Sequence, residues 1–389
     1  KKNGNLIYSE VVGFNDVKNK TPLKEDSLFR IYSMTKPVTG VALMIAVDQG
    51  LVNLSDSVTK YIPEFKNTRV LLDKNKTEKL KRNITLLDLA THTSGLAYTF
   101  SIKGDLQEIY LQEKIFPYYA IDTLSDDVKP EKIYKDICTF SKKVATVPLA
   151  HQPGDAWTYS IGMDILGCVI EKASNMSFGN FLKKNIFEPL QMEDTFFKVP
   201  VAKRSRMTNL YAHHNAFKAF DVDIPKELKG KKPKMYLIDS SRDSLFYKSI
   251  TVEDGGSGLV STASDYSNFA QMLLNKGVYE GKRILSASSF NTLVSNQLNE
   301  KNSRFRGFGM GITLGIALDS KKIRLRRGDN SFFCGGAAKT KFWVDPENEL
   351  TVVHMTQLIG TPRDLTSQID KMIYEDIKNF EKLDKRPGY

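Results

Sequence analysis

Strand-like and helix-like segments are unevenly distributed along this chain, and their distribution limits the folds that it can adopt. Alternating and apolar stretches predict short strands near both ends, while helical patterns dominate the middle. The expected strands are 5–9, 11–14, 28–32, 308–318, 339–345 and 350–356. We therefore expect an α+β fold, with an antiparallel sheet built from both termini and flanked by helices, plus an all-helical lobe.

The same pattern predicts two domains with a site between them. Residues 1–36 and 251–389 are expected to form an α/β sandwich domain, and residues 37–250 a mainly helical domain with insertions. The polar stretch 66–82 reads as an exposed loop, and 200–250 as a long loop or small insertion. The expected helices are 37–48, 84–91, 105–145 with breaks at Pro117 and Pro130, 161–174, 177–184, 264–275 with Ser264 as its N-cap, and 364–380. An active site is expected at the domain junction, because ligands usually bind in such clefts.

Composition and charge exclude several classes of protein. The 389 residues are 41% hydrophobic and 26% charged, as in globular proteins. The longest apolar run, Pro37 to Val47, is shorter than the roughly 20 residues that span a bilayer, so no integral membrane segment is expected. The net charge of +11 comes from scattered basic residues, which favours anionic small molecules over nucleic acid. Oligomeric state and the choice between a cytoplasmic and an exported protein stay open.

Three cysteines are present, Cys138, Cys168 and Cys334, and none lies in a C-x-x-C pair. The odd count argues against a disulfide framework and favours a reducing compartment. Cys168 lies in an apolar helical run and is expected to act as a small buried hydrophobe. The adjacent pair His213 and His214 does not share a helix face, so no metal site and no cofactor are expected.

A Ser-x-x-K motif, Ser33 to Lys36, lies where the strand 28–32 meets the apolar helix 37–48. Positions i and i+3 share one helix face, so the Lys36 amine is expected one turn behind the Ser33 hydroxyl. A nearby amine can take the proton of a serine and activate it as a nucleophile. The helix start also offers free N–H groups to a developing oxyanion.

Two further segments fit the same chemistry. Tyr159 lies at the start of the helix 161–174, and its phenol could carry a proton to or from Ser33 if it lies near Lys36. Cys334, Gly335 and Gly336 precede the strand 339–345, where glycines let the backbone approach a ligand closely. The structural alternatives are a buried tyrosine and an ordinary β-turn.

In this order, the Ser33–Lys36, Tyr159–Ser160 and Gly335–Gly336 segments resemble those of the serine β-lactamase and penicillin-binding-protein superfamily. The closest resemblance is to its class C branch, in particular the family VIII carboxylesterases, and covers about residues 5–375. The stretch 89–96 (LATHTSGL) and the stretch 255–262 (GGSGLVST) also fit that pattern. The resemblance makes His92 structural rather than catalytic.

The resemblance implies roles for individual residues. Ser33 would be the nucleophile, Lys36 would help to deprotonate it, and Tyr159 would move the proton. The backbone N–H groups of Ser33 and Ala337 would form the oxyanion hole. The substrate-binding residues would be Cys334, Gly335, Gly336 and Lys339.

Two departures from the lactamase pattern affect the expected substrate. The Tyr-x-Asn motif has Ile161 in its third position, and the Lys-Thr-Gly motif is replaced by Cys334-Gly335-Gly336. A thiol cannot supply the fixed positive charge that binds a β-lactam carboxylate. We therefore expect a serine hydrolase that cleaves small carboxylic esters, with weak β-lactamase or acyltransferase side activity.

Two alternatives stay open at this point. A D-peptidase or amidase of the penicillin-recognising type would need a cation for the substrate carboxylate, and Lys339 or Arg326 are the candidates. A non-catalytic scaffold or binding protein would be expected to have lost some of Ser33, Lys36 and Tyr159, and all three are intact. An ester or amide is thus the expected small-molecule partner.

Overall fold

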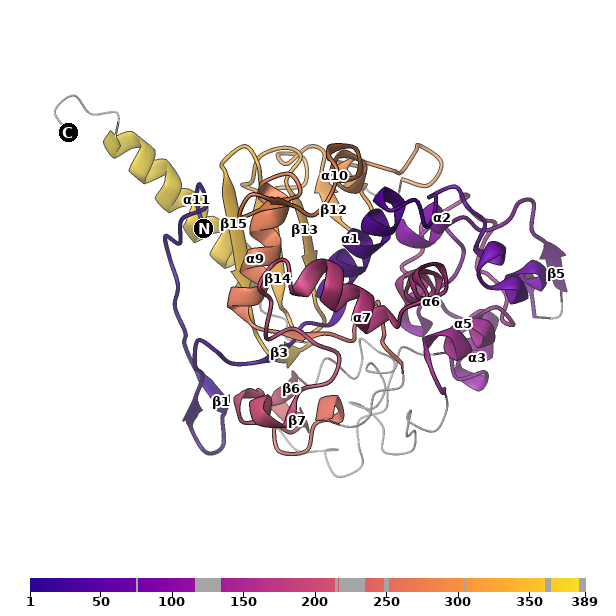
Figure 1. The fold of residues 1–389 in the computed structure, drawn as a ribbon, viewed down its shortest axis with the longest axis horizontal. Coiled ribbons are helices and arrows are strands. Elements are labelled where there is room, and N and C mark those ends of the chain that lie inside the picture. The colour runs from indigo at the N-terminus through magenta and orange to yellow at the C-terminus, as the bar shows by residue number, and fades with distance from the viewer. Residues whose placement is uncertain are drawn as a thin grey trace.

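The computed structural model describes residues 1–74, 76–115, 134–213, 216, 235–247, 252–303, 306–360 and 365–384. Its largest sheet has five antiparallel strands that follow one another in sequence order. These strands are β11 (Phe308–Met310), β12 (Gly315–Ala317), β13 (Phe332–Gly335), β14 (Lys341–Asp345) and β15 (Leu350–His354). Figure 1 shows β13, β14 and β15 beside α9 (Ala263–Leu274), with the amino end and α11 (Leu365–Asp384) on the same side of the molecule.

The amino end of the chain joins this sheet at the edge of β15. The Lys1 amino group donates to the Thr351 carbonyl, and Lys2 forms a β-bridge with Leu350. The expected α+β fold with both termini at the sheet is therefore confirmed. The expected strand at 5–9 is wrong, because Leu6 and Ile7 are 65% and 58% exposed and have no packed face to hold them.

Two short strand pairs complete the amino-terminal part. β1 (Phe14–Asp16) pairs with β2 (Thr21–Pro22) in a small hairpin outside the main sheet. β3 (Phe29–Arg30) pairs with β8 (Val260–Ser261), which brings the segment before Ser33 against the segment that follows Gly258.

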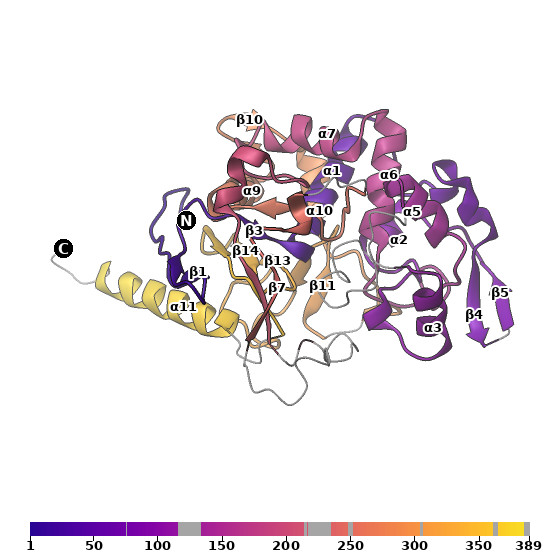
Figure 2. The ribbon, with the colours of Figure 1, turned by 90° about the horizontal axis from the view of Figure 1, so that it is seen from below.

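Helices cover both faces of the main sheet, as the alternation of β14 predicts. Phe342 faces α9 (Ala263–Leu274), where its ring lies 5.0 Å from the Tyr266 ring. Trp343 faces the other way and donates from Nε1 to the Tyr374 hydroxyl on α11 (Leu365–Asp384). In Figure 2, α11 extends along the outer side of the sheet, away from the helical part.

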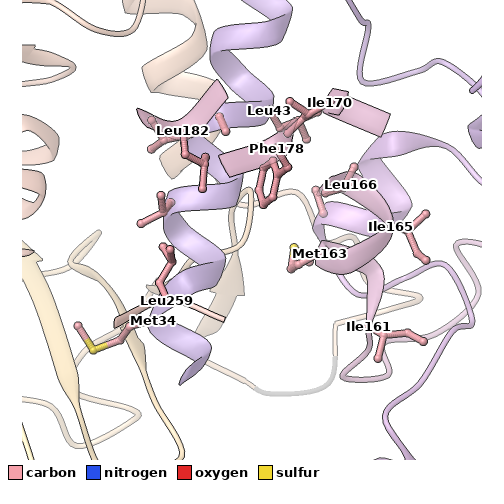
Figure 3. Packing of buried hydrophobic residues seen from close by; sticks show 14 of the residues in the cluster. Met34, Leu43, Ile161, Met163, Ile165, Leu166, Ile170, Phe178, Leu182 and Leu259 are labelled. Carbon is pink, nitrogen blue, oxygen red and sulfur yellow. The ribbon is translucent and has the colours of Figure 1, made fainter. Parts of the chain in front are cut away.

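α1 (Thr35–Asp48) is the central helix of the molecule. Twelve of its 14 residues are buried, which is typical of a helix that is covered on all sides. It contacts α6 (Gly162–Ser174), α7 (Phe178–Leu182) and α10 (Ala287–Val294). Figure 3 shows side chains of this core, among them Leu43, Met163 and Phe178.

The remaining described α-helices and β-strands lie mainly in the middle of the chain. They are α2 (Leu86–Ala90), α3 (Asp105–Gln112), α5 (Ile137–Val144), β4 (Arg69–Asp73), β5 (Lys76–Lys79), β6 (Leu210–His213), β7 (Met235–Asp239), β9 (Val278–Tyr279), β10 (Lys282–Arg283) and β16 (Leu358–Ile359). The middle of the chain thus also contains the antiparallel pairs β4–β5 and β6–β7, and β6 pairs in parallel with β16. Parts of the expected 105–145 helical region and of the 200–250 region lie outside the described residues.

Three local predictions are wrong. The stretch 66–82, expected to be a loop, contains the β4–β5 hairpin, because cross-strand pairing stabilises lysine-rich strands that look like loops in sequence. The stretch 308–318 is not one strand but the hairpin β11–β12, which turns near Thr313 with φ of 66°. The N-cap of α9 is Thr262 rather than Ser264, because the Thr262 side chain accepts from the Asp265 N–H.

The cysteine prediction is also wrong. Cys138 on α5 and Cys168 on α6 form a disulfide, and only Cys334 is free. The two helices pack side by side, so their packing decides the pairing of cysteines 30 residues apart. Within the described ranges, none of the helices is both long and apolar enough to cross a membrane.

Candidate active site

Ser33 lies where a short 3-10 turn, Tyr32–Met34, passes into α1. The preceding residue, Tyr32, has a φ of 44°, which is uncommon for a residue with a side chain. Backbones held in this way concentrate at functional sites, where the surrounding structure imposes them. Ser33 is partly exposed, whereas its neighbours Tyr32, Met34 and Lys36 are buried. The hydroxyl is thus presented at the surface of a rigid helix start.

Two side chains meet at the Ser33 hydroxyl. The Tyr159 hydroxyl donates to Ser33 Oγ at 2.8 Å, and Lys36 Nζ donates to the same oxygen at 3.1 Å. Lys36 Nζ also donates to the Gly256 carbonyl at 2.7 Å and lies 4.9 Å from the centre of the Tyr159 ring. Residues that are 126 positions apart in the chain therefore form one hydrogen-bonded group.

The electrostatics favour a charged lysine in this group. Burial by itself lowers the pKa of Lys36, but the surrounding Tyr159, Asp164 and Cys334 outweigh it, so the pKa is raised. An ammonium that faces both Ser33 and Tyr159 favours negative charge on their oxygens.

Tyr159 is positioned by the turn that ends α2. His92 follows this helix with a φ of 60°, and its carbonyl accepts from the Thr158 N–H. Its Nδ1 accepts from the Ser160 N–H at 3.1 Å, and burial together with Lys36 lowers the pKa of His92 well below its usual value. His92 is therefore neutral and holds the loop of Tyr159, which agrees with the structural role expected for it.

The end of β13 lies directly against the nucleophile. Cys334 Sγ donates to the Ser33 carbonyl at 3.2 Å. A Cβ at Gly336 would lie 2.4 Å from the Ile31 carbonyl oxygen and 2.2 Å from Thr340 Oγ1, so only glycine fits there. The chain at Cys334 and Gly336 thus lies against the segment Ile31–Ser33, and Ala337 is the next residue along it.

The candidate cations occupy three different places. Lys339 is exposed on the turn between β13 and β14, with a φ of 65°. Arg326 lies beside α11, where its N–H donates to Asp370. Lys341 was not among the residues predicted, yet a Cβ at Gly335 would lie 3.9 Å from its Nζ. Lys341 faces Gly335 across β13 and β14, a pairing that the sequence pattern could have indicated only once the strand register was known.

A sandwich with a helical lobe and a Ser-Lys-Tyr group at the start of the central helix defines the class of Ser-x-x-K serine hydrolases. The chain belongs to the Beta-lactamase family, whose model matches residues 2–373. The family and the enzyme class expected from the sequence are thereby confirmed.

Individual relatives agree with this assignment. Protein Rv1367c of Mycobacterium tuberculosis (strain ATCC 25618 / H37Rv) is 30% identical over 368 residues, which cover 90% of this chain and 82% of the relative. Esterase EstB of Burkholderia gladioli is 31% identical over 50% of this chain and 45% of the relative. The solved structure of EstCE1, a hydrolase with promiscuous acyltransferase activity, matches with a TM-score of 0.73 over 96% of this chain and 92% of that chain. It is 21% identical in sequence, so this likeness concerns the fold.

Proposed function

We propose that this protein is a serine hydrolase that cleaves carboxylic esters through an acyl-enzyme on Ser33. One observation carries the proposal: Ser33 Oγ is within hydrogen-bond distance of both the Tyr159 hydroxyl and Lys36 Nζ, at 2.8 and 3.1 Å. A weak nucleophile held against a proton acceptor and a cation is the arrangement that acyl transfer requires.

In acylation, the Ser33 proton moves to the Tyr159 oxygen as Ser33 Oγ attacks the ester carbonyl. This step starts from Tyr159 as a phenolate, after the phenol has lost to solvent the proton that it donates to Ser33 Oγ in the structure, and the Lys36 ammonium stabilises the phenolate. Tyr159 then gives the proton to the departing alkoxide, so the leaving group departs as a neutral alcohol and Ser33 retains the acyl group.

The oxyanion of the tetrahedral intermediate needs two donors. The N–H of Ser33 is in the first turn of a helix, where backbone N–H groups have no intrahelical partner. The N–H of Ala337 follows the strand end that contacts Ile31 and Ser33. Both groups belong to rigid backbone, which lets them stabilise the developing charge without rearrangement.

In deacylation, Tyr159 takes a proton from water as the water oxygen attacks the acyl carbonyl. Tyr159 then gives this proton to Ser33 Oγ as the bond to the acyl group breaks, which releases the acid and restores the free enzyme. An alcohol that replaces water at this step would receive the acyl group instead. The relatives named as an esterase and as a hydrolase with acyltransferase activity support both outcomes for this chain.

The test is hydrolysis of p-nitrophenyl acetate by the wild type, Ser33→Ala and Tyr159→Phe, with intact-mass detection of an acetyl adduct. In the wild type we expect turnover and a protein species whose mass is greater by one acetyl group. We expect neither in Ser33→Ala. The Tyr159→Phe variant is expected to lose about 10³-fold or more in kcat, since it lacks the proton carrier. A wild type without turnover and without an adduct would contradict the proposal.

A second candidate is hydrolysis of esters or amides that carry a carboxylate, including the D-peptide substrates considered above. Lys341 supports it, since this cation lies next to Gly335 and its charge acts on Cys334 beside Ser33. Cys334 cannot supply that charge, since a thiol has no cationic form and burial raises the pKa of this thiol and keeps it neutral. Paired assays of a neutral ester and a succinyl-type ester with Lys341→Met distinguish the two candidates.

A further inference from the structure

Two buried carboxyl groups lie behind Lys36 and have no part in the steps above. Asp164 is in the first turn of α6 and Asp254 precedes the glycine segment 255–256, and both are 1% exposed. The Gly256 N–H donates to an oxygen of each, at 3.0 Å for Asp164 and 2.6 Å for Asp254. The carbonyl of the same residue accepts from Lys36 Nζ at 2.7 Å. A single residue thus joins the two acids to the lysine.

The two acids differ in their hydrogen bonds. Asp254 accepts from the N–H groups of Gly256 and Ser257 and from the Ser257 hydroxyl. Such a set of donors suits an ionised carboxylate. Oδ2 of Asp164, in contrast, is buried without a hydrogen-bond partner among the described residues. A buried anionic oxygen without a donor is costly, so Asp164 is better described as a neutral acid.

The surroundings of Asp164 support the neutral form. The Tyr98 hydroxyl is also buried without a partner in the described part of the chain. A Cβ at Gly256 would lie 2.6 Å from this hydroxyl and 2.9 Å from Asp164 Oδ2, so the two groups flank the same glycine. An ionised Asp164 would attract the Tyr98 proton, yet no hydrogen bond joins them. Burial and the neighbouring Asp254 raise the pKa of Asp164 well above its usual value.

We propose that Asp164 and Asp254 form a buried acid pair that holds one proton and one negative charge behind Lys36, and that this charge sets the pH range in which Lys36 and Tyr159 act together as a base. The proposal rests on the proposed function, because it concerns the same catalytic group. Asp164 and Asp254 are positioning residues, since they reach the reacting atoms only through Lys36.

The other titratable groups around Lys36 do not replace this charge. Tyr98 stays protonated, because burial and the two acids raise its pKa well above the usual value. Burial likewise keeps the thiol of Cys334 and the imidazole of His92 neutral. Tyr159 is the partner in the reaction itself. Of the groups that face Lys36 in the described structure, the acid pair therefore supplies the permanent negative charge.

The test compares pH profiles of kcat/KM for p-nitrophenyl acetate in three enzymes. Asp164→Asn replaces a neutral acid by a neutral amide that can make the same hydrogen bonds. The acidic and basic limbs of its pH profile should therefore lie at the same pH values as in the wild type. The double variant Asp164→Asn/Asp254→Asn removes the charge, and both limbs should move to lower pH by about one unit. The matched control is Asp265→Asn, which removes a buried carboxyl on α9 that hydrogen-bonds Thr195, and its limbs should not move.

A limb shift in Asp164→Asn as large as that in the double variant would overturn the proposal, as would a double variant with wild-type limbs. If the double variant does not fold, infrared spectroscopy tests the proposal without any measurement of turnover. The wild type at pH 7 should show the infrared carbonyl band of a protonated carboxylic acid, and Asp164→Asn should lack it. Absence of that band in the wild type would overturn the acid pair, whereas its presence in a wild type without esterase activity would overturn only the proposed function.

Discussion

Arg30 and Lys36 are two buried cations on the same short segment, but their side chains have different partners. Arg30 is fully buried and is neutralised by Asp239, with further hydrogen bonds to the Thr208 carbonyl and to Ser244 Oγ. Lys36 is 2% exposed, yet its two hydrogen bonds go to neutral oxygens, those of Ser33 and Gly256. Its nearest carboxyl groups, those of Asp164 and Asp254, lie one residue further, behind Gly256.

The difference separates a structural cation from a reactive one. Asp239 lies on β7, so the ion pair of Arg30 joins the strand before the nucleophile to the β6–β7 hairpin. A directly paired Lys36 would have its charge cancelled and could not stabilise charge on Ser33 or Tyr159. The comparison predicts that one cation maintains the fold and the other maintains the activity.

The largest effect is expected for Lys36→Met. Loss of the ammonium should reduce kcat for p-nitrophenyl acetate by about 10³-fold or more, since the proton carrier loses its counter-charge. Stability should stay within about 1 kcal/mol of the wild type, because Lys36 makes no direct ion pair and Asp254 keeps its hydrogen bonds from Gly256 and Ser257. Steady-state kinetics and urea unfolding measure both, and a variant that unfolds while losing activity would contradict the distinction.

Arg30→Met should show the opposite behaviour. It leaves Asp239 buried without its cation, and we expect the free energy of unfolding to fall by about 3–5 kcal/mol. The matched control is Lys60→Met, which breaks the exposed pair with Asp56 and should cost less than about 1 kcal/mol. The molecules of Arg30→Met that remain folded in low urea should keep a kcat close to that of the wild type.

A smaller effect is expected in the pH dependence of stability. The pKa of Asp164 is raised on folding, so the folded state binds a proton that the unfolded state releases above about pH 4. This contribution stabilises the fold at low pH and is lost as the pH rises towards the folded-state pKa. Asp164→Asn lacks this contribution. As the pH rises, its free energy of unfolding should therefore increase relative to that of the wild type by up to about 1.4 kcal/mol per pH unit. Urea unfolding between pH 4.5 and 8 measures the difference, and parallel curves would contradict it.

The smallest effect is expected for Lys341→Met, which tests whether a third cation binds the carboxylate of a substrate. A carboxylate-bearing ester should lose about tenfold in kcat/KM, a loss of the size of one partly exposed charge interaction. A neutral ester of the same chain length should be unaffected. Lys339→Met is the control on the neighbouring turn, and an equal loss in this variant would assign the substrate contact to Lys339 instead.

The sequence predicted the reactive residues more completely than it predicted the residues that surround them. Ser33 and Lys36 are three residues apart, so helix geometry alone brings them together, and the flanking patterns placed them at a helix start. Tyr159, Gly335 and Gly336 were candidates from their local context, and only the resemblance to a family assigned them to the same site, since no local rule relates residues so far apart. Lys341 and the Asp164–Asp254 pair were missed because strand register and loop packing, not spacing, bring them to the site.

By itself, the sequence determined the α+β class, the position of the nucleophile and the expectation of an ester-cleaving enzyme, because these depend on periodicity and on short motifs. Tertiary structure decided which cysteines pair, which polar stretch becomes the β4–β5 hairpin and which buried charges are neutralised. Arg30 and Lys36 look alike in the sequence, since both are single basic residues in the mostly apolar segment 28–38. Only the folded chain, by placing Asp239 against one and Gly256 against the other, makes the first a structural ion pair and the second a reactive cation.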